Sequence, residues 1–138
     1  MTTAIESRLL LAAETAADLM SPVASIPQRA SFPEAVAFFI DRNTTVAPVL
    51  GDRGEPVGVL SIADLLIHVR ASAPADRIAP ATVGELMTPT VFSVTPETPA
   101  ADVIHDMLRS KVHHLFVIDP EGRIKGVVSA CDVLQYLQ

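Results

Sequence analysis

The feature that most constrains this chain is an internal repeat. The sequence LMSP at residues 19–22 returns as LMTP at residues 86–89, which lies 67 positions later. The sequence GEPVGVLSIAD at residues 54–64 returns as GRIKGVVSACD at residues 122–132, which lies 68 positions later. Two blocks that recur at nearly the same spacing indicate two copies of one small structural unit. One residue must be inserted between the blocks, and we expect it near the end of the helix that follows Pro33.

Length and composition agree with two small units that share a core. The chain has 138 residues, and a unit of about 60 residues buries only about 60% of its unfolded surface, so it is marginal alone. Hydrophobic residues make up 49% of the chain, which argues against disorder. Aromatic residues make up only 4%, so the core must be aliphatic. We assign residues 1–75 to a lead-in helix and the first unit, and residues 76–138 to the end of the linker and the second unit.

Each copy shows the same order of elements, β-α-β-β-α. A helical turn ends before Pro22, because proline cannot continue a helix. The helix of the first copy begins at Ser31, with Glu34 at capping-box distance, and that of the second begins at Thr98. The expected strands are 23–27, 46–50 and 57–60 in the first copy and 90–95, 114–118 and 124–128 in the second. The final helices begin at Ser61 and Ser129, residues 3–19 form a lead-in helix, and residues 71–80 form a linker.

This order of elements, the Leu-Met-x-Pro opening and the Gly-apolar-apolar-Ser-x-x-Asp closing block resemble the cystathionine β-synthase (CBS) domain. The resemblance covers residues 16–70 and 83–137. It implies an α/β fold in which two CBS modules pack with pseudo-twofold symmetry, as in a stand-alone Bateman module. It also implies a homodimer, because such pairs commonly dimerise.

The Ser-x-x-Asp block has two explanations, and the residues leave both open. Serine at a helix N-cap with aspartate three residues later is a capping box, which needs no ligand. The same helix start suits a phosphate, while a carboxylate one turn in can accept ribose hydroxyls. In the CBS family the matching serine contacts phosphate and the matching aspartate contacts ribose. The resemblance therefore assigns these roles to Ser61 and Asp64 and to Ser129 and Asp132.

The other expected binding residues follow from the position of the two copies. The resemblance places adenine against the first extended segment of each copy. A phosphate near an aspartate also calls for a cation, and the second copy has several before its second strand, which makes it the favoured phosphate site. The adenine candidates are Ser25, Ile26 and Pro27 in the first copy and Ser93, Val94 and Thr95 in the second. The cation candidates are Arg109, Lys111, His113 and His114. The ligands considered are AMP, ADP and ATP, with S-adenosylmethionine, NAD and a cyclic dinucleotide as further options.

Several other functions are not expected. The net charge is −6 with no basic block, which argues against nucleic acid and anionic membranes as partners. No apolar run approaches a membrane span and no secretory signal opens the chain, so we expect a cytoplasmic protein. Cys131 is the single cysteine, so an intramolecular disulfide is excluded, and we expect it to be inert and at least half-buried. Neighbours on a strand point to opposite faces, so His113 and His114 are not expected to share a metal ion.

Two functions remain in competition. The first is a regulatory module that binds an adenosine-type nucleotide and signals to a separate partner protein. The second is a ligand-free dimerisation or protein-interaction scaffold, which the high apolar content of a short chain favours. Catalysis is not expected, because the sequence contains no Ser–His–Asp order, no glycine-rich phosphate loop and no spaced set of metal ligands.

Overall fold

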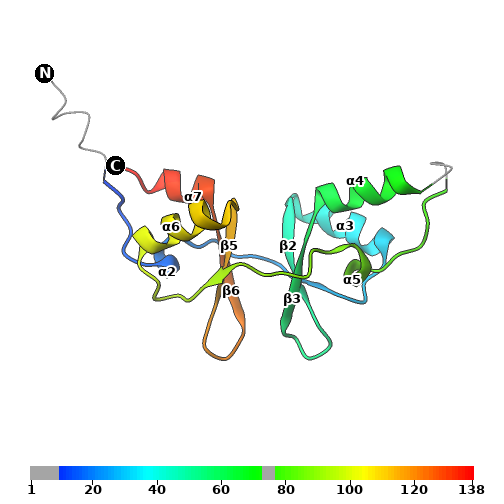
Figure 1. The fold of residues 1–138 in the computed structure, drawn as a ribbon, viewed down its shortest axis with the longest axis horizontal. Helices are drawn as coiled ribbons and strands as arrows, with labels where there is room; N and C mark the ends of the chain where they lie inside the picture. Colours follow the sequence, from blue (N-terminus) through cyan, green and yellow to red (C-terminus); the bar gives the residue numbers. More distant parts are fainter. Residues whose placement is uncertain (1–9, 73–76) are drawn as a thin grey trace, which may run out of the picture. The chain divides into compact units, whose positions relative to one another are not determined.

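The computed structural model describes residues 10–72 and 77–138, and it confirms an α/β chain built from two similar units. One compact unit, Ala24–Val91, is continuous in sequence, and we call it the central unit. The other joins Met1–Val23 to Phe92–Gln138, and we call it the split unit. Each unit has a three-stranded sheet with helices packed on it (Figure 1).

The central unit follows the predicted order. Strand β1 (Ile26–Pro27) pairs in parallel with β2 (Val46–Leu50), which pairs antiparallel with β3 (Pro56–Ser61). The helices are α3 (Phe32–Arg42), α4 (Ile62–Ala71) and the short α5 (Val83–Leu86). The predicted start of α3 is confirmed, because the Ser31 hydroxyl accepts the amide of Glu34 and the Glu34 carboxylate accepts the amide of Ser31.

The split unit repeats this arrangement. Strand β4 (Ser93–Val94) pairs in parallel with β5 (His114–Ile118), and β5 pairs antiparallel with β6 (Ile124–Ser129). Its helices are α2 (Ala16–Leu19), α6 (Ala100–Ser110) and α7 (Ala130–Gln135). The two hairpins were predicted to within a residue or two, and each turn uses a glycine at positive φ, Gly54 at 80° and Gly122 at 83°.

The compact units do not coincide with the two sequence copies. The backbone of Ser21, from the opening of the first copy, forms two hydrogen bonds with Val127 in β6, at 2.8 and 2.9 Å. The backbone of Thr88, from the opening of the second copy, forms the matching pair with Val59 in β3, both at 2.9 Å. Each sheet therefore carries the opening segment of the other copy, so the predicted division after residue 75 separates the sequence repeats but not the packed units.

These contacts require glycine in the receiving strand. A Cβ on Gly126 would lie 2.7 Å from the carbonyl oxygen of Ser21 and 3.0 Å from the sulfur of Met20. A Cβ on Gly58 would lie 2.6 Å from the carbonyl oxygen of Thr88 and 2.6 Å from the sulfur of Met87. Since real side chains do not approach this closely, the glycine of each closing block lets the opening segment lie directly on the strand.

The prediction of a lead-in helix over residues 3–19 is wrong for its described part. Residues 1–9 lie outside the described part of the chain, and the only helix up to Leu19 in the remainder is Ala16–Leu19. The backbone of Leu10 instead bonds to Gln138, and the amide of Ala12 donates to the carbonyl of Tyr136. A helix begins only after Thr15, whose amide donates to the Asp18 carboxylate at 3.2 Å. Residues 10 and 12 therefore pair with residues 138 and 136 instead of forming a helix, and this tertiary pairing overrides their helix propensity.

The inserted residue also lies elsewhere than predicted. The N-caps of α2 and α5, Thr15 and Thr82, are 67 positions apart. The N-caps of α3 and α6 are already 68 positions apart, and both helices have the same length. The insertion therefore precedes these helices, and the equivalent buried residues Ile26 and Val94 place it before the first strand of each unit.

Each unit has an aliphatic core between its sheet and its helices. In the split unit this core includes Leu19, Val103, Leu115 and Val128, all nearly inaccessible to solvent. In the central unit Phe38 and Phe39 of α3 join the aliphatic residues. Full burial of one such side chain is worth roughly 1.5–3 kcal/mol, so these cores hold the final helices, and the residues at their starts, in place.

Candidate functional site: two helix starts

The two Ser-x-x-Asp blocks form capping boxes where a strand runs directly into a helix. At the start of α4 the amide of Ser61 donates to Asp64 Oδ2 at 2.8 Å, and the amide of Asp64 donates to Ser61 Oγ at 3.3 Å. At the start of α7 the corresponding distances are 2.9 Å, from the Ser129 amide to Asp132 Oδ2, and 3.0 Å, from the Asp132 amide to Ser129 Oγ. The four side chains are all partly accessible, so capping leaves each of them open to a further partner.

The helix starts offer fewer free amides than the sequence suggested. The first helical amide of α4, at Ile62, donates to the carbonyl of Thr45, and that of α7, at Ala130, donates to the carbonyl of His113. The third helical amide is taken by the capping serine in both helices. Only the second helical amide, at the exposed residues Ala63 and Cys131, remains for an anion, so side chains must supply most contacts to a bound phosphate.

The hydroxyl groups of the two capping serines form different hydrogen bonds. Ser61 Oγ donates its hydrogen to Asp64 Oδ2 at 3.0 Å. No such bond joins Ser129 Oγ to Asp132 within the described residues, although Ser129 Oγ accepts the Asp132 amide. A hydroxyl carries one donor and two acceptor positions, so the Ser129 hydroxyl keeps its hydrogen for another acceptor.

The second carboxylate oxygen of Asp132 is also held. The Ser21 hydroxyl donates to Asp132 Oδ1 at 3.3 Å, and Ser21 comes from the opening segment of the first copy. Sequence reasoning missed Ser21 as a site residue, although it belongs to the repeated LMSP block. The signal was hidden because the contact joins residues 111 positions apart, and only the exchange of opening segments brings them together.

His114, which was predicted as a cation together with its neighbour His113, faces the second helix start. In the β5–β6 register His114 lies directly opposite Ser129, so the two side chains share one face of the sheet. Burial and the neighbouring His113 lower the pKa of His114, and the charge of Asp132 partly opposes this shift. The first copy has Val46 opposite Ser61, so it offers no titratable group at this position.

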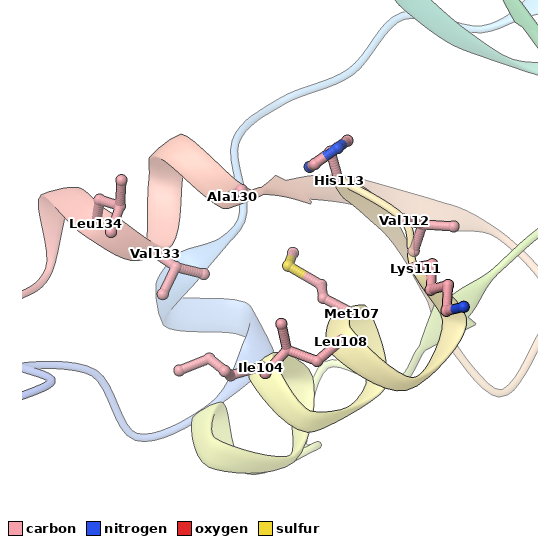
Figure 2. Close-up of a pocket in the computed structure, with 9 residues that line it drawn as sticks. All are labelled: Ile104, Met107, Leu108, Lys111, Val112, His113, Ala130, Val133 and Leu134. Atoms are coloured by element: carbon pink, nitrogen blue, oxygen red, sulfur yellow. The ribbon is translucent and has the colours of Figure 1, made fainter.

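The other predicted cations lie around helix α6. Arg109 is exposed and forms an ion pair with Asp106 on the same helix, at 2.8 Å. Lys111 is the C-cap of α6 with a φ of 58°, and His113 is exposed. Lys111 and His113 line a shared groove between α6 and α7, as Figure 2 shows. In the part of the chain that the structure describes, no hydrogen bond joins any of these three side chains to Asp132 or Ser129.

The predicted adenine segments are only partly available. The side chains of Ile26 and Val94 are almost fully buried in the cores of their units, so they offer little surface to a ligand. Ser25, Pro27, Ser93 and Thr95 are exposed. The amide of Thr95 donates to the Thr98 hydroxyl at 3.1 Å. A base that binds at these segments would therefore meet their backbone and short polar side chains.

An apolar groove lies between α6 and α7 (Figure 2). Its volume is about 500 Å³. Leu108 and Leu134 are 74% and 64% exposed at its rim. Their equivalents in the central unit, Ile40 and Leu66, are 72% and 62% exposed, so both copies present the same apolar pair to solvent. The lining residues are Ile104, Met107, Leu108, Lys111, Val112, His113, Ala130, Val133 and Leu134.

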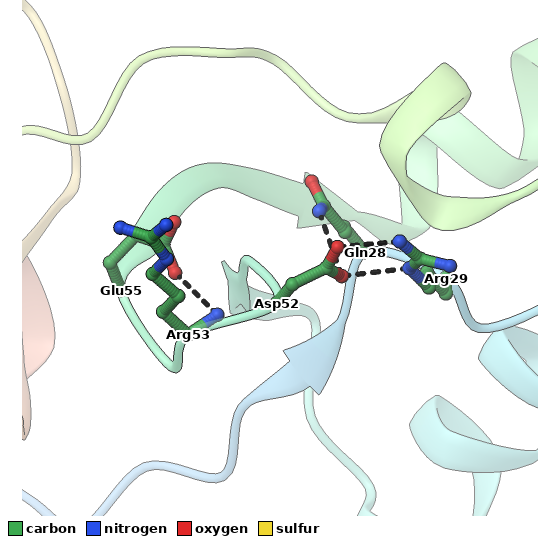
Figure 3. A network of polar contacts seen from close by, with 5 residues as sticks. All are labelled: Gln28, Arg29, Asp52, Arg53 and Glu55. Carbon is green, nitrogen blue, oxygen red and sulfur yellow. Dashed lines mark hydrogen bonds and ion pairs between the residues drawn. The ribbon is translucent and has the colours of Figure 1, made fainter.

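A network of polar side chains lies at the tip of the β2–β3 hairpin in the central unit. The Arg29 guanidinium donates to both carboxylate oxygens of Asp52 at the hairpin tip, at 2.7 and 2.5 Å, and Gln28 donates to the same carboxylate at 3.3 Å (Figure 3). The bond from Arg29 lowers the pKa of Asp52. The equivalent positions in the second copy hold Glu97 and Pro120, so the network cannot form there.

Three further predictions concern chemistry outside these helix starts. Cys131 is exposed, so the expectation that it is at least half-buried is wrong: it occupies the outward face of the first turn of α7. Among the described residues no group of three or more histidine, cysteine, aspartate or glutamate side chains could hold a metal ion. None of the helices within residues 10–72 and 77–138 has the length and apolar character needed to cross a membrane.

The fold and the paired helix starts define a tandem α/β module in which the same strand-to-helix capping box occurs twice. The CBS domain model matches residues 16–71 and again residues 83–138, and this chain therefore belongs to the CBS domain family.

Curated relatives carry related sequences within longer chains. The 5'-AMP-activated protein kinase subunit gamma-3 of Bos taurus is 33% identical over 109 residues, which are 75% of this chain and 22% of the relative. The magnesium transporter MgtE of Thermus thermophilus is 34% identical over 90 residues, which are 65% of this chain and 18% of the relative. This chain spans about a fifth of the length of these relatives.

Solved structures share the fold. CBSX2 in complex with AMP has a TM-score of 0.74 at 26% identity, covering 89% of this chain and 95% of that one. The cytosolic domain of the Mg²⁺ channel MgtE in complex with ATP has a TM-score of 0.74 at 28% identity, covering 88% of this chain and 48% of that one. Structures of this family have therefore been solved with adenine nucleotides bound.

Proposed function

We propose that this chain is a regulatory module that binds an adenine nucleotide and transmits the binding event to a partner protein. The observation that carries the proposal is the pair of Ser-x-x-Asp helix starts, formed in both copies of a CBS pair. The similarity to CBSX2 with AMP and to MgtE with ATP supports AMP, ADP or ATP as the ligand. S-adenosylmethionine and NAD share the adenosine group and belong in the same test.

The second copy is the better site for a phosphate-bearing ligand. The Ser129 hydroxyl keeps its hydrogen for a phosphate oxygen, whereas that of Ser61 is donated to Asp64. His114 lies opposite Ser129, and its lowered pKa leaves a neutral ring near pH 7 that can donate one N–H to an anion. We assign Asp132 to the ribose hydroxyls and Ser129 to the phosphate, with Asp64 and Ser61 in the same roles at a weaker first site.

The remaining predicted residues take secondary places in this proposal. Lys111 and His113 lie on the connection from α6 to β5, where the charge of Lys111 can attract a phosphate without touching the capping box. Arg109 contributes less, because Asp106 neutralises it. The exposed residues Ser25, Ser93 and Thr95 remain the candidate contacts for adenine. The role assigned to the chain is regulatory and cytoplasmic, with no catalytic step.

Signalling in this proposal passes through a homodimer. Each copy presents an equivalent pair of exposed apolar side chains on its helices, and in the split unit these side chains border an apolar groove. Exposed apolar groups of this kind mark association surfaces. A nucleotide that favours one arrangement of the associated chains would shift the population toward it, and a partner protein can read that shift.

The second candidate function is a scaffold that dimerises without a ligand. The observation that favours it is that the serine and the aspartate of each helix start already hydrogen-bond to each other as a cap. On this alternative the Ser-x-x-Asp blocks serve the fold alone. Both candidate functions predict that the exposed apolar side chains hold a dimer together. Only a measurement of nucleotide binding therefore distinguishes the scaffold from the regulatory module.

Calorimetric titration of the chain with AMP, ADP, ATP, S-adenosylmethionine and NAD tests the proposal. We expect at least one of them to bind, and Asp132→Asn to weaken it by about tenfold or more, since a hydrogen bond to a charged group is worth about 1.5–3 kcal/mol. Asp102→Asn is the matched control, because Asp102 is exposed on α6 and its loss changes the net charge equally. If none of the five ligands binds, the proposal is wrong and the scaffold remains.

A further inference from the structure

The two aspartates of the repeat differ in which lone pairs they have left. Asp64 Oδ2 accepts two hydrogen bonds from Ser61, one from its amide and one from its hydroxyl. A carboxylate oxygen has about two acceptor positions, so Asp64 Oδ2 is filled and only Oδ1 remains for a ligand. Asp132 accepts one hydrogen bond on each oxygen, from the Ser129 amide on Oδ2 and from the Ser21 hydroxyl on Oδ1.

This distribution suits a pair of adjacent hydroxyl groups. Asp132 keeps one acceptor position on each oxygen, and the two oxygens of one carboxylate match the spacing of vicinal hydroxyls on a five-membered sugar ring. With each oxygen held by a donor on the protein, the carboxylate cannot rotate freely before the ligand arrives, which reduces the ordering cost on binding. Asp64 is held through one oxygen only and lacks this preparation.

The difference arises from the opening segments. Ser21 and Thr88 occupy the same place in the repeat, and both pair through their backbones with the closing strand beside them. The Ser21 hydroxyl reaches Asp132, whereas Thr88 is exposed and, among the described residues, forms no hydrogen bond with Asp64. The side chain at this position, rather than the exchange of segments itself, therefore distinguishes the two carboxylates.

We infer that Ser21 is a positioning residue that prepares Asp132 for a vicinal diol and so makes the second site selective for ribonucleotides. The inference rests on the proposed function, and it adds a residue from the opposite sequence copy to that site. Ser21 acts through Asp132 and touches no ligand itself. Selectivity between ribose and deoxyribose, rather than affinity alone, is the property that it controls.

The test compares AMP with 2'-deoxy-AMP by calorimetric titration, on the unsubstituted chain and on Ser21→Ala, Ser21→Thr and Thr88→Val. We expect the unsubstituted chain to prefer AMP by about tenfold or more, as for loss of one hydrogen bond to a charged group. Ser21→Ala should lower this preference at least threefold, and Ser21→Thr should lower it as well, because Thr88 at the equivalent position does not reach its aspartate among the described residues. Thr88→Val, the matched control, should leave the preference unchanged.

The outcomes separate the inference from the function on which it rests. A residue with a merely structural role would weaken AMP and 2'-deoxy-AMP together and leave their ratio unchanged. If Ser21→Ala binds AMP with the original preference, the positioning role is wrong while the proposed function stands. If the unsubstituted chain binds AMP and 2'-deoxy-AMP equally, or binds neither, this inference is wrong, whereas the proposed function fails only if none of its five candidate ligands binds.

Discussion

His114 lies directly opposite Ser129 in the β5–β6 pairing, at the point where β6 continues into α7. The same register in the first copy pairs Val46 with Ser61. One helix start therefore faces a titratable ring and the other faces an aliphatic side chain. This difference places a titratable ring opposite the Ser-x-x-Asp serine in the second copy and none there in the first.

We expect the chain to become less stable as the pH is lowered, partly because of His114. Burial lowers the pKa of this ring in the folded state below its ordinary value of 6.5, so the unfolded chain binds the proton more readily. The neutral ring therefore makes its full contribution to the free energy of unfolding above about pH 6.5. This contribution is lost as the pH falls from about 6.5 through the pKa of the folded state. His114→Val, which copies the first unit, should flatten the dependence of the urea midpoint on pH between 7.5 and 5.

His105→Asn is the control for this measurement, because His105 is exposed on α6. It should leave the pH dependence close to that of the unsubstituted chain. If His114→Val and His105→Asn change the dependence equally, the environment of His114 has no special effect on stability.

Gly126 is expected to tolerate no side chain. A methyl group there would lie 2.7 Å from a backbone oxygen of Ser21, which cannot move without breaking the pairing of the opening segment with β6. Overpacking of this kind costs about 1–3 kcal/mol, so Gly126→Ala should lower the free energy of unfolding by that amount in urea titration. Gly122→Asn should cost a few tenths of a kcal/mol, because nothing lies near its Cβ and asparagine tolerates positive φ. Equal losses in both variants would show that the close approach at Gly126 does not limit stability.

Lys111 is expected to have two separate effects. Its backbone conformation strains the fold, and its positive charge favours the binding of a phosphate. Its φ of 58° is unfavourable for most residues, while the equivalent C-cap in the central unit, at φ 50°, is Asn43. Lys111→Asn should therefore raise the free energy of unfolding, by up to about 1 kcal/mol, in a urea titration. The same variant should weaken ATP binding, because a positive charge near the phosphate is lost. A less stable variant would contradict the first part, and unchanged ATP affinity would contradict the second.

Much of the fold was predictable because each copy carries its own local signals. Proline and glycine mark the turns, serine with an acidic residue three positions later marks the helix starts, and aliphatic runs mark the hairpin strands. These signals act over a few residues, and Ser31, Ser61 and Ser129 are N-caps in the structure as predicted. Reading them twice, at nearly constant spacing, removed most of the ambiguity that a single copy leaves.

The site was less predictable, because its distinguishing contacts depend on long-range pairing. Neither the bond from Ser21 to Asp132 nor the register of His114 with Ser129 follows from local periodicity. Each sheet carries a glycine, Gly58 or Gly126, that lets an opening segment lie on it, so these glycines alone do not reveal which sheet receives which segment. The prediction of a lead-in helix was wrong for a related reason, since Leu10 pairs with Gln138, a residue far away in the sequence.

The homodimer is expected to depend on the apolar rim of the α6–α7 groove. Leu108 and Leu134 are largely exposed there, and a charge placed on an associating apolar surface must be desolvated without a partner. Leu108→Glu and Leu134→Glu should therefore convert a dimer to a monomer in sedimentation experiments, while the melting temperature of the fold changes little. Leu10→Glu is the control, because Leu10 is 70% exposed but lies outside the groove. A chain that is monomeric without substitution, or rim variants that remain dimeric, would show that the groove does not hold two copies together.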